Sequence, residues 1–405
     1  MTSIKKSKWM WAPAFAVAFA GLGVAQLQLQ QHADAAAVAA PAFQVDPFWP
    51  KPLPNHWLLG NVIGVAVDSR DHVYIVHRND KFAATEIGLK SGVSECCQPA
   101  PPVIEFDPEG NVVRAWGGPG EGYNWPSSNH GMEVDSKGNV WIGGNGGSYG
   151  AAEQKGEPFD SHILVFTNDG KFIKQWGEPL QPTDSNSTSH FGKVAEIAID
   201  ETLGDVYVAD GYGNKRVAVL EFNSKNLAFK KYWGAYGNKP ADERIRYTPG
   251  EPLPQQFVGP VHCAQPSNDG LLYVCDRGAD RVQVFKRDGT FVKEKQIAPN
   301  TRAQGSTWDI AFSRDKEQKY MYVVDGQNMK IYVMLRDTLD ILYSFGDGGR
   351  QPGLWYAPHS IVTDSKGNLY TTETYEGKRI QKFVYQGIKP VAKQNQGAAW
   401  PKGKS

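Results

Sequence analysis

The sequence has no excess of charge of either sign and almost no long apolar runs. Its 405 residues include 43 Lys and Arg against 43 Asp and Glu. This balance argues against a nucleic-acid-binding surface and against a polybasic membrane anchor. Beyond the N-terminal segment, no run approaches the roughly 20 apolar residues that a membrane-spanning helix needs. We therefore expect no nucleic-acid partner and no membrane contact outside that segment.

Residues 1–35 have the order of a secretory signal peptide. Lys5, Lys6 and Lys8 precede the apolar run WMWAPAFAVAFAGLGVA, and the small residues ADA at 33–35 follow as a cleavage site. A retained N-terminal anchor is the alternative. Both interpretations put the folded part outside the cytoplasm, so we expect a periplasmic or secreted protein.

Cysteine is also scarce, with four residues in the whole chain. Cys263 and Cys275 lie on the two arms of a predicted hairpin, CAQPSNDGLLYVC, where a cross-strand disulfide fits. Cys96 and Cys97 lie in a proline-rich loop, and the sequence assigns them no role. An extracytoplasmic compartment permits disulfides at both places.

What the chain has in abundance is glycine (43 residues), aromatic residues (12 Trp, 17 Tyr and 18 Phe) and one repeated hairpin. Each repeat has an apolar strand, a turn of Asp, Ser, Asn or Gly, and a second β-rich strand. The six copies are IGVAVDSRDHVYIVHR, HGMEVDSKGNVWIGGN, AEIAIDETLGDVYVADGY, HCAQPSNDGLLYVCDR, WDIAFSRDKEQKYMYVVDG and HSIVTDSKGNLYTTET. Most copies are followed by two more strands, as in ILVFTNDGKFIKQWG.

Four strands in each of six units predict an all-β fold, a six-bladed NHL-type β-propeller with four-stranded antiparallel blades. The repeats delimit the propeller at residues 56–385. They leave an N-terminal extension at 36–55 and a flexible C-terminal tail at 386–405. Four insertions (79–101, 144–160, 178–192 and 236–258) are expected to be surface loops.

Histidine recurs at one position of the repeat. Five residues before the turn Asp or Ser, the six units carry in order Ile63, His130, Ala195, His262, Trp308 and His359. Alternate blades of a six-bladed ring are 120° apart, so the three histidines would converge on the channel axis. Three imidazoles with an open fourth position are a common arrangement for catalytic Zn²⁺. The alternative is three unrelated histidines that hydrogen-bond backbone groups.

The second strand of each hairpin returns to the face where the first began, so its end should lie beside the histidines. There the sequence offers Arg78 in VHRND, Tyr212 in ADGYGNKR and Arg277 in CDRGADR. Nearby positive charge favours a phenolate, which would make Tyr212 a usable general base. The two arginines could clamp a carboxylate. The alternative is that Asp caps these turns and Arg packs between blades. His77 faces the other side of its strand and is expected to be structural.

At these residues the sequence resembles the peptidyl-α-hydroxyglycine α-amidating lyase family, over roughly residues 56–385. The resemblance implies that His130 in NHGMEVDSKGN, His262 in VHCAQ and His359 in PHSIVTDSKGN bind zinc. It implies Tyr212 as the catalytic base, Arg78 as the catalytic arginine and Arg277 as a second arginine of the site. The family's reaction cleaves the C–N bond of a carbinolamide to give an amide and an aldehyde such as glyoxylate.

The sequence departs from the family pattern at two positions. Ser360 stands where the family has a calcium-binding aspartate, so the resemblance implies a central Ca²⁺ less strongly than Zn²⁺. Gly213 replaces a cysteine of the family's tyrosine turn, so one family disulfide is missing. The chain also has no copper-dependent hydroxylating domain, which a separate chain could supply.

Three function classes follow. The first is a periplasmic or secreted zinc lyase that acts on a small-molecule or peptide α-hydroxy-amide. The second is a metal-dependent hydrolase of the lactonase type; such propellers usually hold calcium with Glu, Asn and Asp, and the threefold histidine set argues against this. The third is a non-enzymatic NHL module, which has no need of histidines in alternate blades. The substrate and the oligomeric state do not follow from the sequence.

Overall fold

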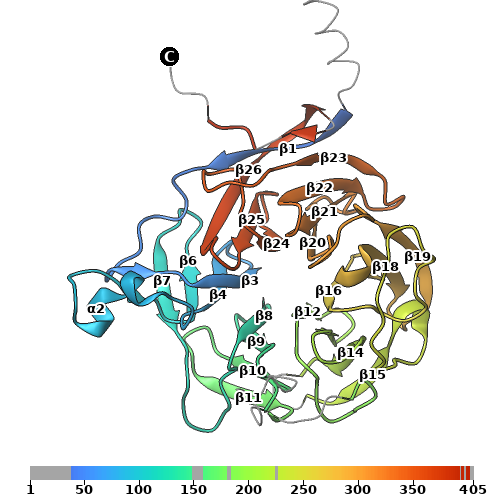
Figure 1. Cartoon of the computed structure of the whole chain (residues 1–405), viewed down its shortest axis with the longest axis horizontal. Helices are drawn as coiled ribbons and strands as arrows, with labels where there is room; N and C mark the ends of the chain where they lie inside the picture. The colour runs from blue at the N-terminus through green and yellow to red at the C-terminus, as the bar shows by residue number, and fades with distance from the viewer. Residues whose placement is uncertain are drawn as a thin grey trace, which may run out of the picture.

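The computed structural model describes residues 38–147, 158–179, 184–223, 227–392, 394–395 and 398–401. The expected signal peptide, 1–35, lies outside these residues. Six sheets of four antiparallel strands surround a central opening, and the innermost strands are β3, β8, β12, β16, β20 and β24 (Figure 1). The predicted six-bladed β-propeller is therefore confirmed.

The blades follow chain order, and the first strand of each is the innermost. Blade one contains β3 (Asn61–Val67), β4 (Val73–Arg78), β6 (Val103–Phe106) and β7 (Val112–Trp116). Blade two contains β8 (Asn129–Val134), β9 (Val140–Gly144), β10 (Ile163–Phe166) and β11 (Phe172–Trp176). Blade three contains β12 (Glu196–Asp200), β13 (Asp205–Asp210), β14 (Arg216–Glu221) and β15 (Phe229–Trp233).

Blades four to six continue the same plan. Blade four contains β16 (Val261–Pro266), β17 (Leu271–Asp276), β18 (Arg281–Lys286) and β19 (Phe291–Gln296). Blade five contains β20 (Asp309–Phe312), β21 (Tyr320–Asp325), β22 (Lys330–Leu335), β23 (Ile341–Phe345) and the short parallel strand β27 (Gln394–Asn395). Blade six contains β24 (Pro358–Thr363), β25 (Leu369–Glu373), β26 (Arg379–Val391) and β1 (Val38–Asp46).

The DSKGN turns of blades two and six show why the hairpins form where the sequence predicts them. Asp135 accepts hydrogen bonds from the backbone N–H and the side-chain amide of Asn139, both at 2.8 Å. Asp364 accepts the same pair from Asn368, at 2.9 and 2.7 Å. The intervening Gly138 has φ +80°, a left-handed conformation that glycine adopts without strain.

Apolar side chains fill the space between every pair of neighbouring blades. Six clusters of buried residues occupy the six interfaces. Between blades two and three, for example, Trp141 and Ile163 pack with Ile197 and Val206. Full burial of one such side chain stabilises a fold by about 1.5–3 kcal/mol. The stacked blades therefore hold the channel strands in fixed positions.

Blade six takes its outermost strand from the opposite end of the chain. Strand β1 pairs with β26 from Val38–Val391 to Asp46–Lys382, with a bulge between Pro41 and Phe43. The Tyr343 hydroxyl donates a hydrogen bond to the Pro41 carbonyl from the neighbouring blade. The ring thus includes strand residues on both sides of the range 56–385 that the repeats delimit.

Two disulfides occur among the described residues. Cys263 and Cys275 are bonded across the β16–β17 pair, as the hairpin pattern predicts. Cys96 and Cys97 are bonded to each other. They lie just before β5 (Gln98–Pro99), which pairs with β2 (Trp57–Leu58), and after the short helix α2 (Gly88–Ser91). No helix in the described part of the chain is long and apolar enough to cross a membrane.

The strands that precede the four insertions all end on one face of the ring. Those at 79–101 and 144–160 follow β4 and β9, and those at 178–192 and 236–258 follow β11 and β15. Because the strands of a blade are antiparallel, all four of these strands end on the face where the innermost strands begin. That face also carries the aligned histidines.

Candidate functional site

The three histidines lie where their strands depart from regular pairing. The β8–β9 ladder shifts register between Asn129 and Met132, and the β16–β17 and β24–β25 ladders shift at the equivalent positions. His130, His262 and His359 fall inside these irregular segments. A β-bulge re-aims a side chain, and bulges are common beside functional sites. The register shifts account for three histidine side chains that turn together into the channel.

The three imidazoles converge, as the repeat alignment predicts. The ring centroids of His130 and His359 are 4.8 Å apart, those of His262 and His359 4.9 Å, and those of His130 and His262 5.3 Å. One ring nitrogen from each lies within 4.8 Å of the others. The side chains are almost fully buried, with 1%, 2% and 3% exposure for His130, His262 and His359. Three nitrogen donors from three blades therefore face one point.

Backbone carbonyls of the other three blades fix the orientation of these rings. The Nδ1 atom of His130 lies 2.6 Å from the Ala195 carbonyl oxygen. The Nδ1 of His262 lies 2.5 Å from the Trp308 carbonyl, and that of His359 lies 2.8 Å from the Ile63 carbonyl. A carbonyl can only accept, so each Nδ1 carries the proton and each Nε2 keeps a free lone pair. Metal-ligating histidines are held in this way.

The acceptors occupy the same repeat position as the histidines they hold. Ile63, Ala195 and Trp308 are the aligned residues of blades one, three and five. The alternation of the sequence is thus an alternation of imidazole donors and carbonyl acceptors around the ring.

Burial keeps the imidazoles uncharged. It lowers the pKa of His130 and of His262 well below the usual value, and the other charged groups of the site lower both further. Burial, with the charges of Arg277 and Arg78, lowers the pKa of His359 to about 3. Neutral imidazole is the form that binds a metal ion. The set of donors therefore fits a zinc ion of the three-histidine kind.

Tyr212 reaches the same point from blade three. Its hydroxyl lies 3.1 Å from Nε2 of His130 and 3.0 Å from Nε2 of His262. The residue sits in the turn after β13, where Asp210 forms a buried ion pair with Arg216 at 2.8 Å. At Gly211, a Cβ atom would overlap the backbone of Val261. Only glycine lets this turn approach blade four closely enough to place the tyrosine at the histidines.

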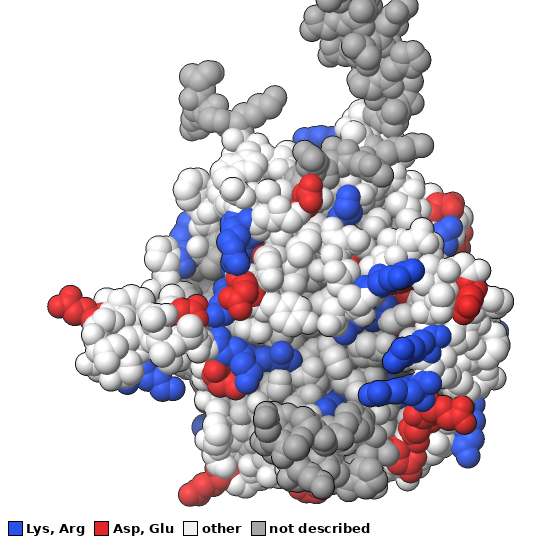
Figure 2. Space-filling view, viewed as in Figure 1, with Lys and Arg blue, Asp and Glu red and all other residues white. Residues whose placement is uncertain are grey.

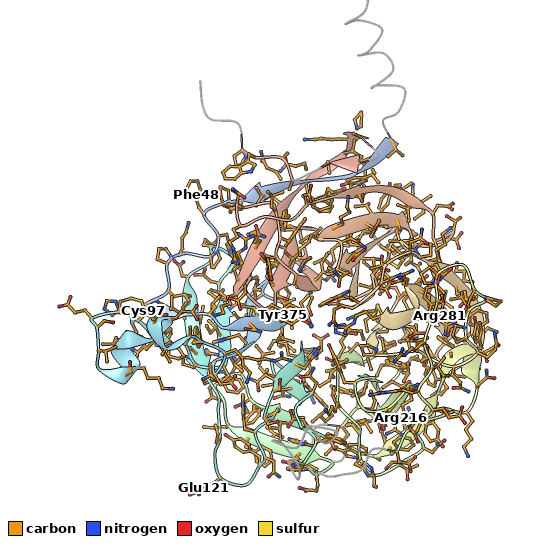
Figure 3. All side chains as sticks on the ribbon, viewed as in Figure 1. Phe48, Cys97, Glu121, Arg216, Arg281 and Tyr375 are labelled. Atoms are coloured by element: carbon orange, nitrogen blue, oxygen red, sulfur yellow. A yellow bond between two sulfur atoms is a disulfide. The ribbon has the colours of Figure 1, made fainter. Side chains whose placement is uncertain are left out.

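Arg277 is the arginine that touches Tyr212. Its guanidinium donates to the Tyr212 hydroxyl at 3.1 Å and to Gln304 at 2.8 Å. It also stacks over the ring of Trp308, with its central carbon 4.5 Å from the ring centroid. The turn is fixed by Asp276, which pairs with the buried Arg281 at 2.9 Å. Arg216 and Arg281 themselves lie within their blades, away from the central opening (Figure 3).

Arg78 lies on the same side of the channel but is held by blade two. It donates to the Asn129 carbonyl at 3.2 Å and to the Asn145 side chain at 2.8 Å. Its charge acts on His130 and His359 without a hydrogen bond to Tyr212. The neighbouring His77 points into the blade and bonds Gly60 and Pro101.

The repeat alignment did not identify several other residues of the site. Asn145 and Gln304 position the two arginines, and Trp308 supplies both a stacking surface and a carbonyl. Tyr375 lies close to the centre of the ring (Figure 3). The alignment includes only one of these residues, Trp308 at the aligned position of blade five, and it did not predict the role of that residue in the site.

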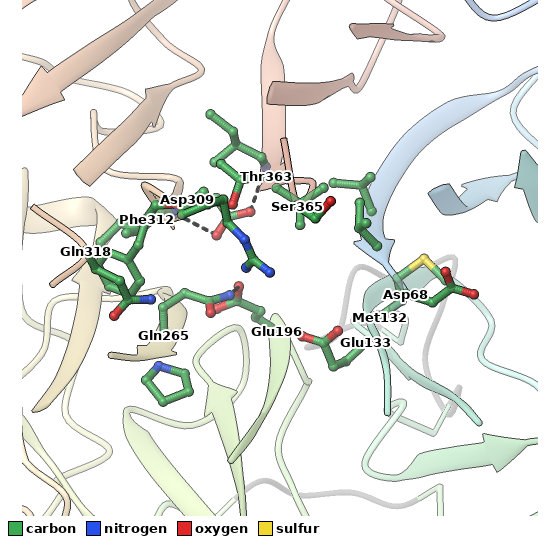
Figure 4. Close-up of a pocket in the computed structure, with 18 of the residues that line it drawn as sticks. Asp68, Met132, Glu133, Glu196, Gln265, Asp309, Phe312, Gln318, Thr363 and Ser365 are labelled. Atoms are coloured by element: carbon green, nitrogen blue, oxygen red, sulfur yellow. Dashed lines mark hydrogen bonds between the residues drawn. The ribbon is translucent and has the colours of Figure 1, made fainter. Parts of the chain in front are cut away.

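Deeper in the channel, carboxylates line a second cavity of about 480 Å³ (Figure 4). Glu196 accepts hydrogen bonds from the Ala264 N–H and the Gln265 side chain, at 2.7 and 2.6 Å. Burial raises the pKa of Asp309 to about 6 and that of Glu133 to about 7. Ser360, at the position of the family's calcium-binding aspartate, donates its hydroxyl to the Ile63 carbonyl at 2.7 Å.

Fold and site together define a six-bladed β-propeller with a candidate three-histidine metal centre at the mouth of its channel. The chain is similar to NHL repeat-containing protein 3 and to peptidyl-α-hydroxyglycine α-amidating lyases, so the resemblance predicted from the motifs is confirmed. No family model matches the chain.

Within the matched regions, these relatives are about a quarter identical to this chain. NHL repeat-containing protein 3 of Mus musculus is 25% identical over 85% of this chain and 84% of that protein. Peptidylglycine alpha-amidating monooxygenase of Rattus norvegicus is 27% identical over 83% of this chain. The matched region is only 32% of that protein's length. Peptidyl-alpha-hydroxyglycine alpha-amidating lyase 1 of Drosophila melanogaster is 24% identical over 85% of this chain and 60% of that protein.

Among solved structures, a streptogramin B lyase superposes with a TM-score of 0.49 at 12% identity. It covers 85% of this chain and 98% of that structure.

Proposed function

We propose that the protein is a zinc-dependent lyase that cleaves the C–N bond of an α-hydroxylated amide, releasing an amide and an aldehyde such as glyoxylate. One observation carries the proposal. The Tyr212 hydroxyl lies within hydrogen-bonding distance of two of the three converging Nε2 atoms and of Arg277. A proton acceptor, three metal donors and a cation therefore meet at one point.

His130, His262 and His359 would hold the zinc ion. When bound, zinc supplies a Lewis acid that polarises the substrate hydroxyl or a neighbouring carboxylate oxygen. Three neutral, pre-oriented imidazoles offer nitrogen ligands, which suit zinc. Calcium prefers oxygen ligands, so these residues fit zinc better than calcium.

Tyr212 would take the proton of the carbinolamide hydroxyl. The electrons of that O–H bond form the new C=O bond, the C–N bond breaks, and the leaving amide nitrogen takes the proton that Tyr212 accepted, which returns Tyr212 to its starting state. Arg277 donates a hydrogen bond to the Tyr212 hydroxyl, so a positive charge lies beside the oxygen that takes the proton. Arg78 and Arg277 offer two guanidinium groups to a substrate carboxylate.

The same proposal places the protein outside the cytoplasm. The basic, apolar and small-residue order of residues 1–35 supports a periplasmic or secreted location. The disulfide between Cys263 and Cys275 supports an oxidising compartment.

A non-enzymatic binding scaffold is the second candidate. The similarity to NHL repeat-containing protein 3 favours it, since it extends over 84% of that protein, whose name states no reaction. A scaffold of this kind has no need of bound zinc, which makes the two candidates separable.

Elemental analysis of the purified mature protein tests the proposal. We expect about one zinc per chain in the wild type and none in His130→Ala. His56→Ala, which removes an exposed histidine of the same chain, is the matched control and should keep the metal. Assay of an N-acyl-α-hydroxyglycine should show glyoxylate release by the wild type and the control only. If the wild type contains no zinc, or if His130→Ala keeps its zinc, the lyase proposal is contradicted and the binding scaffold is favoured.

A further inference from the structure

We propose that the groove leading away from Tyr212 binds an acidic peptide segment, so that the substrate is a peptide with carboxylate side chains upstream of the reacting residue. This inference rests on the proposed lyase function and names its substrate class. The groove begins in a cavity of about 320 Å³ lined by Tyr212, Lys215 and Arg244. Arg244, Val258 and Gly259 also line the adjoining cavity of about 750 Å³. The two cavities therefore adjoin each other, and the smaller one is lined by Tyr212 of the candidate site.

Arginine side chains supply the charge of this groove. Arg244, Arg246 and Arg302 all line the larger cavity and are all exposed. None of the three forms an ion pair within the described part of the chain. Figure 2 shows Lys and Arg side chains gathered on the blade-four side of the central hollow. Free guanidinium groups are the preferred partners of carboxylates, since they can donate two parallel hydrogen bonds.

The nearby acidic groups do not cancel this charge. Asp242 lines the smaller cavity, where it accepts hydrogen bonds from the backbone and the hydroxyl of Ser185. Glu243 and Glu251 are the other carboxylates of this loop, and neither lines the two cavities. The backbone carbonyl of Glu243 accepts a hydrogen bond from Lys215. Lys215 and the three arginines outnumber these three carboxylates, so the groove is positive.

The groove also has an apolar component and a fixed wall. Ile245, Tyr247, Pro249 and Val258 line it between the arginines. The Tyr247 hydroxyl donates to the Pro299 carbonyl at 3.0 Å, which fastens the loop after blade three to the loop after blade four. A cavity of this size holds a drug-sized ligand, so it exceeds the needs of a small hydroxy acid. Charge, apolar surface and length together fit a peptide.

The backbone beside Arg277 directs the groove to the reacting centre. Gly278, next to Arg277, lines the larger cavity, and so does Gly305. A Cβ atom at Gly305 would overlap the Arg277 carbonyl, so the two turns are in direct contact. A peptide in the groove would pass over this turn and present its end to Arg277 and Tyr212.

Fluorescence anisotropy with two labelled peptides tests the inference without turnover. Glu-Glu-Phe-Gly and Gln-Gln-Phe-Gly differ only in charge, and neither can react because its terminal glycine lacks the hydroxyl. We expect the wild type to bind the acidic peptide about fivefold more tightly at low ionic strength, and the preference to fall with added salt. In the triple variant Arg244→Ala/Arg246→Ala/Arg302→Ala, the two peptides should bind equally.

A matched triple variant removes the same charge from the opposite face. Lys137→Ala/Arg314→Ala/Lys366→Ala changes three exposed residues in turns beyond the far ends of the innermost strands. This variant should keep the wild-type preference, and circular dichroism checks that both triples are folded. Equal binding of the two peptides by the wild type, or a preference that survives the loss of the three groove arginines, overturns the inference.

The two proposals can fail separately. α-Hydroxyglycine versions of the same peptides are assayed for glyoxylate release. If the wild type prefers the acidic peptide in binding but releases no glyoxylate, the groove proposal stands and the lyase proposal is refuted. Turnover without any charge preference in binding would retain the lyase and refute the groove.

Discussion

The hydroxyl of Tyr212 lies 3.1 Å from Nε2 of His130, although 82 positions separate the two residues and they belong to consecutive blades. His262, the other partner of this hydroxyl, comes from the blade on the far side. The proton acceptor of the proposed reaction is therefore positioned by the packing of three neighbouring blades and not by one loop.

Tyr212→Phe separates metal binding from proton transfer. Phenylalanine keeps the ring and its packing but removes the hydroxyl, so the three imidazoles should still bind zinc. Loss of a general base typically costs about 10²–10⁴-fold in rate. We expect kcat for glyoxylate release to fall by that factor while elemental analysis still finds zinc. A variant with near-normal kcat would show that Tyr212 is not the base.

Gly211→Ala tests the close approach that places Tyr212. The new Cβ would overlap the Val261 backbone, which belongs to a buried strand and has no room to move. We expect a loss of at least about 2 kcal/mol in the free energy of unfolding, together with lower activity. Gly348→Ala is the control, because nothing lies within 4 Å of its Cβ position. Urea denaturation of both variants checks this prediction.

His77 should make the protein less stable in acid. Burial lowers its pKa to about 4, from an ordinary value near 6.5. Between these two pH values the unfolded chain binds a proton that the folded chain does not. The free energy of unfolding therefore falls as pH falls from about 6.5 to about 4, by roughly 3 kcal/mol from this residue.

His77→Gln is the variant that isolates this contribution. The glutamine amide can accept from Gly60 and donate to Pro101, which are the two partners of the imidazole. The pH dependence of unfolding by urea should be shallower in His77→Gln by about the same amount. An unchanged slope between pH 4 and 6.5 would refute the assignment.

Glu133 should make the protein less stable as pH rises, which is the opposite of the effect of His77. Burial raises its pKa to about 7, so the folded chain keeps a proton that the unfolded chain releases above about 4.5. Stability from this residue is present below that value and is lost as pH rises to about 7. We expect Glu133→Gln to stabilise the protein by roughly 3 kcal/mol at pH 8 and to change nothing at pH 4.

The control for that comparison is Glu221→Gln, which changes an exposed carboxylate on β14. It should leave the free energy of unfolding nearly the same at both pH values. A stabilisation by Glu133→Gln that is equal at pH 4 and pH 8 would exclude titration as its cause.

The repeated hairpins and the contacts that follow from their alignment could be predicted, and most contacts between segments far apart in the sequence could not. Six copies of one hairpin predict six blades, and the aligned histidines predict their own convergence. Strand β1 has no neighbouring strand in the sequence, because its partner β26 is more than 300 positions away. The contacts of Arg277 with Gln304 and of Arg78 with Asn145 join different loops, which no spacing in the sequence relates.

The channel carboxylates show a second limit. Glu196 and Asp309 come directly after the aligned positions of blades three and five. Those positions hold no histidine, so no pattern in the sequence places the two carboxylates in the channel. Whether such a residue faces the channel depends on the local register of its strand. Strands β12 and β20 pair with β13 and β21 without a register shift, and only the packing of the six blades shows that both carboxylates line the channel.

The pairing of β1 with β26 sets an order of events for the newly made protein. The first strand of the described chain, Val38–Asp46, has no partner until the last blade has been made, so the ring stays open throughout synthesis. His359 belongs to that same last blade. The three histidines therefore come together only after the last blade has been made, so the metal centre proposed for them would assemble late in folding.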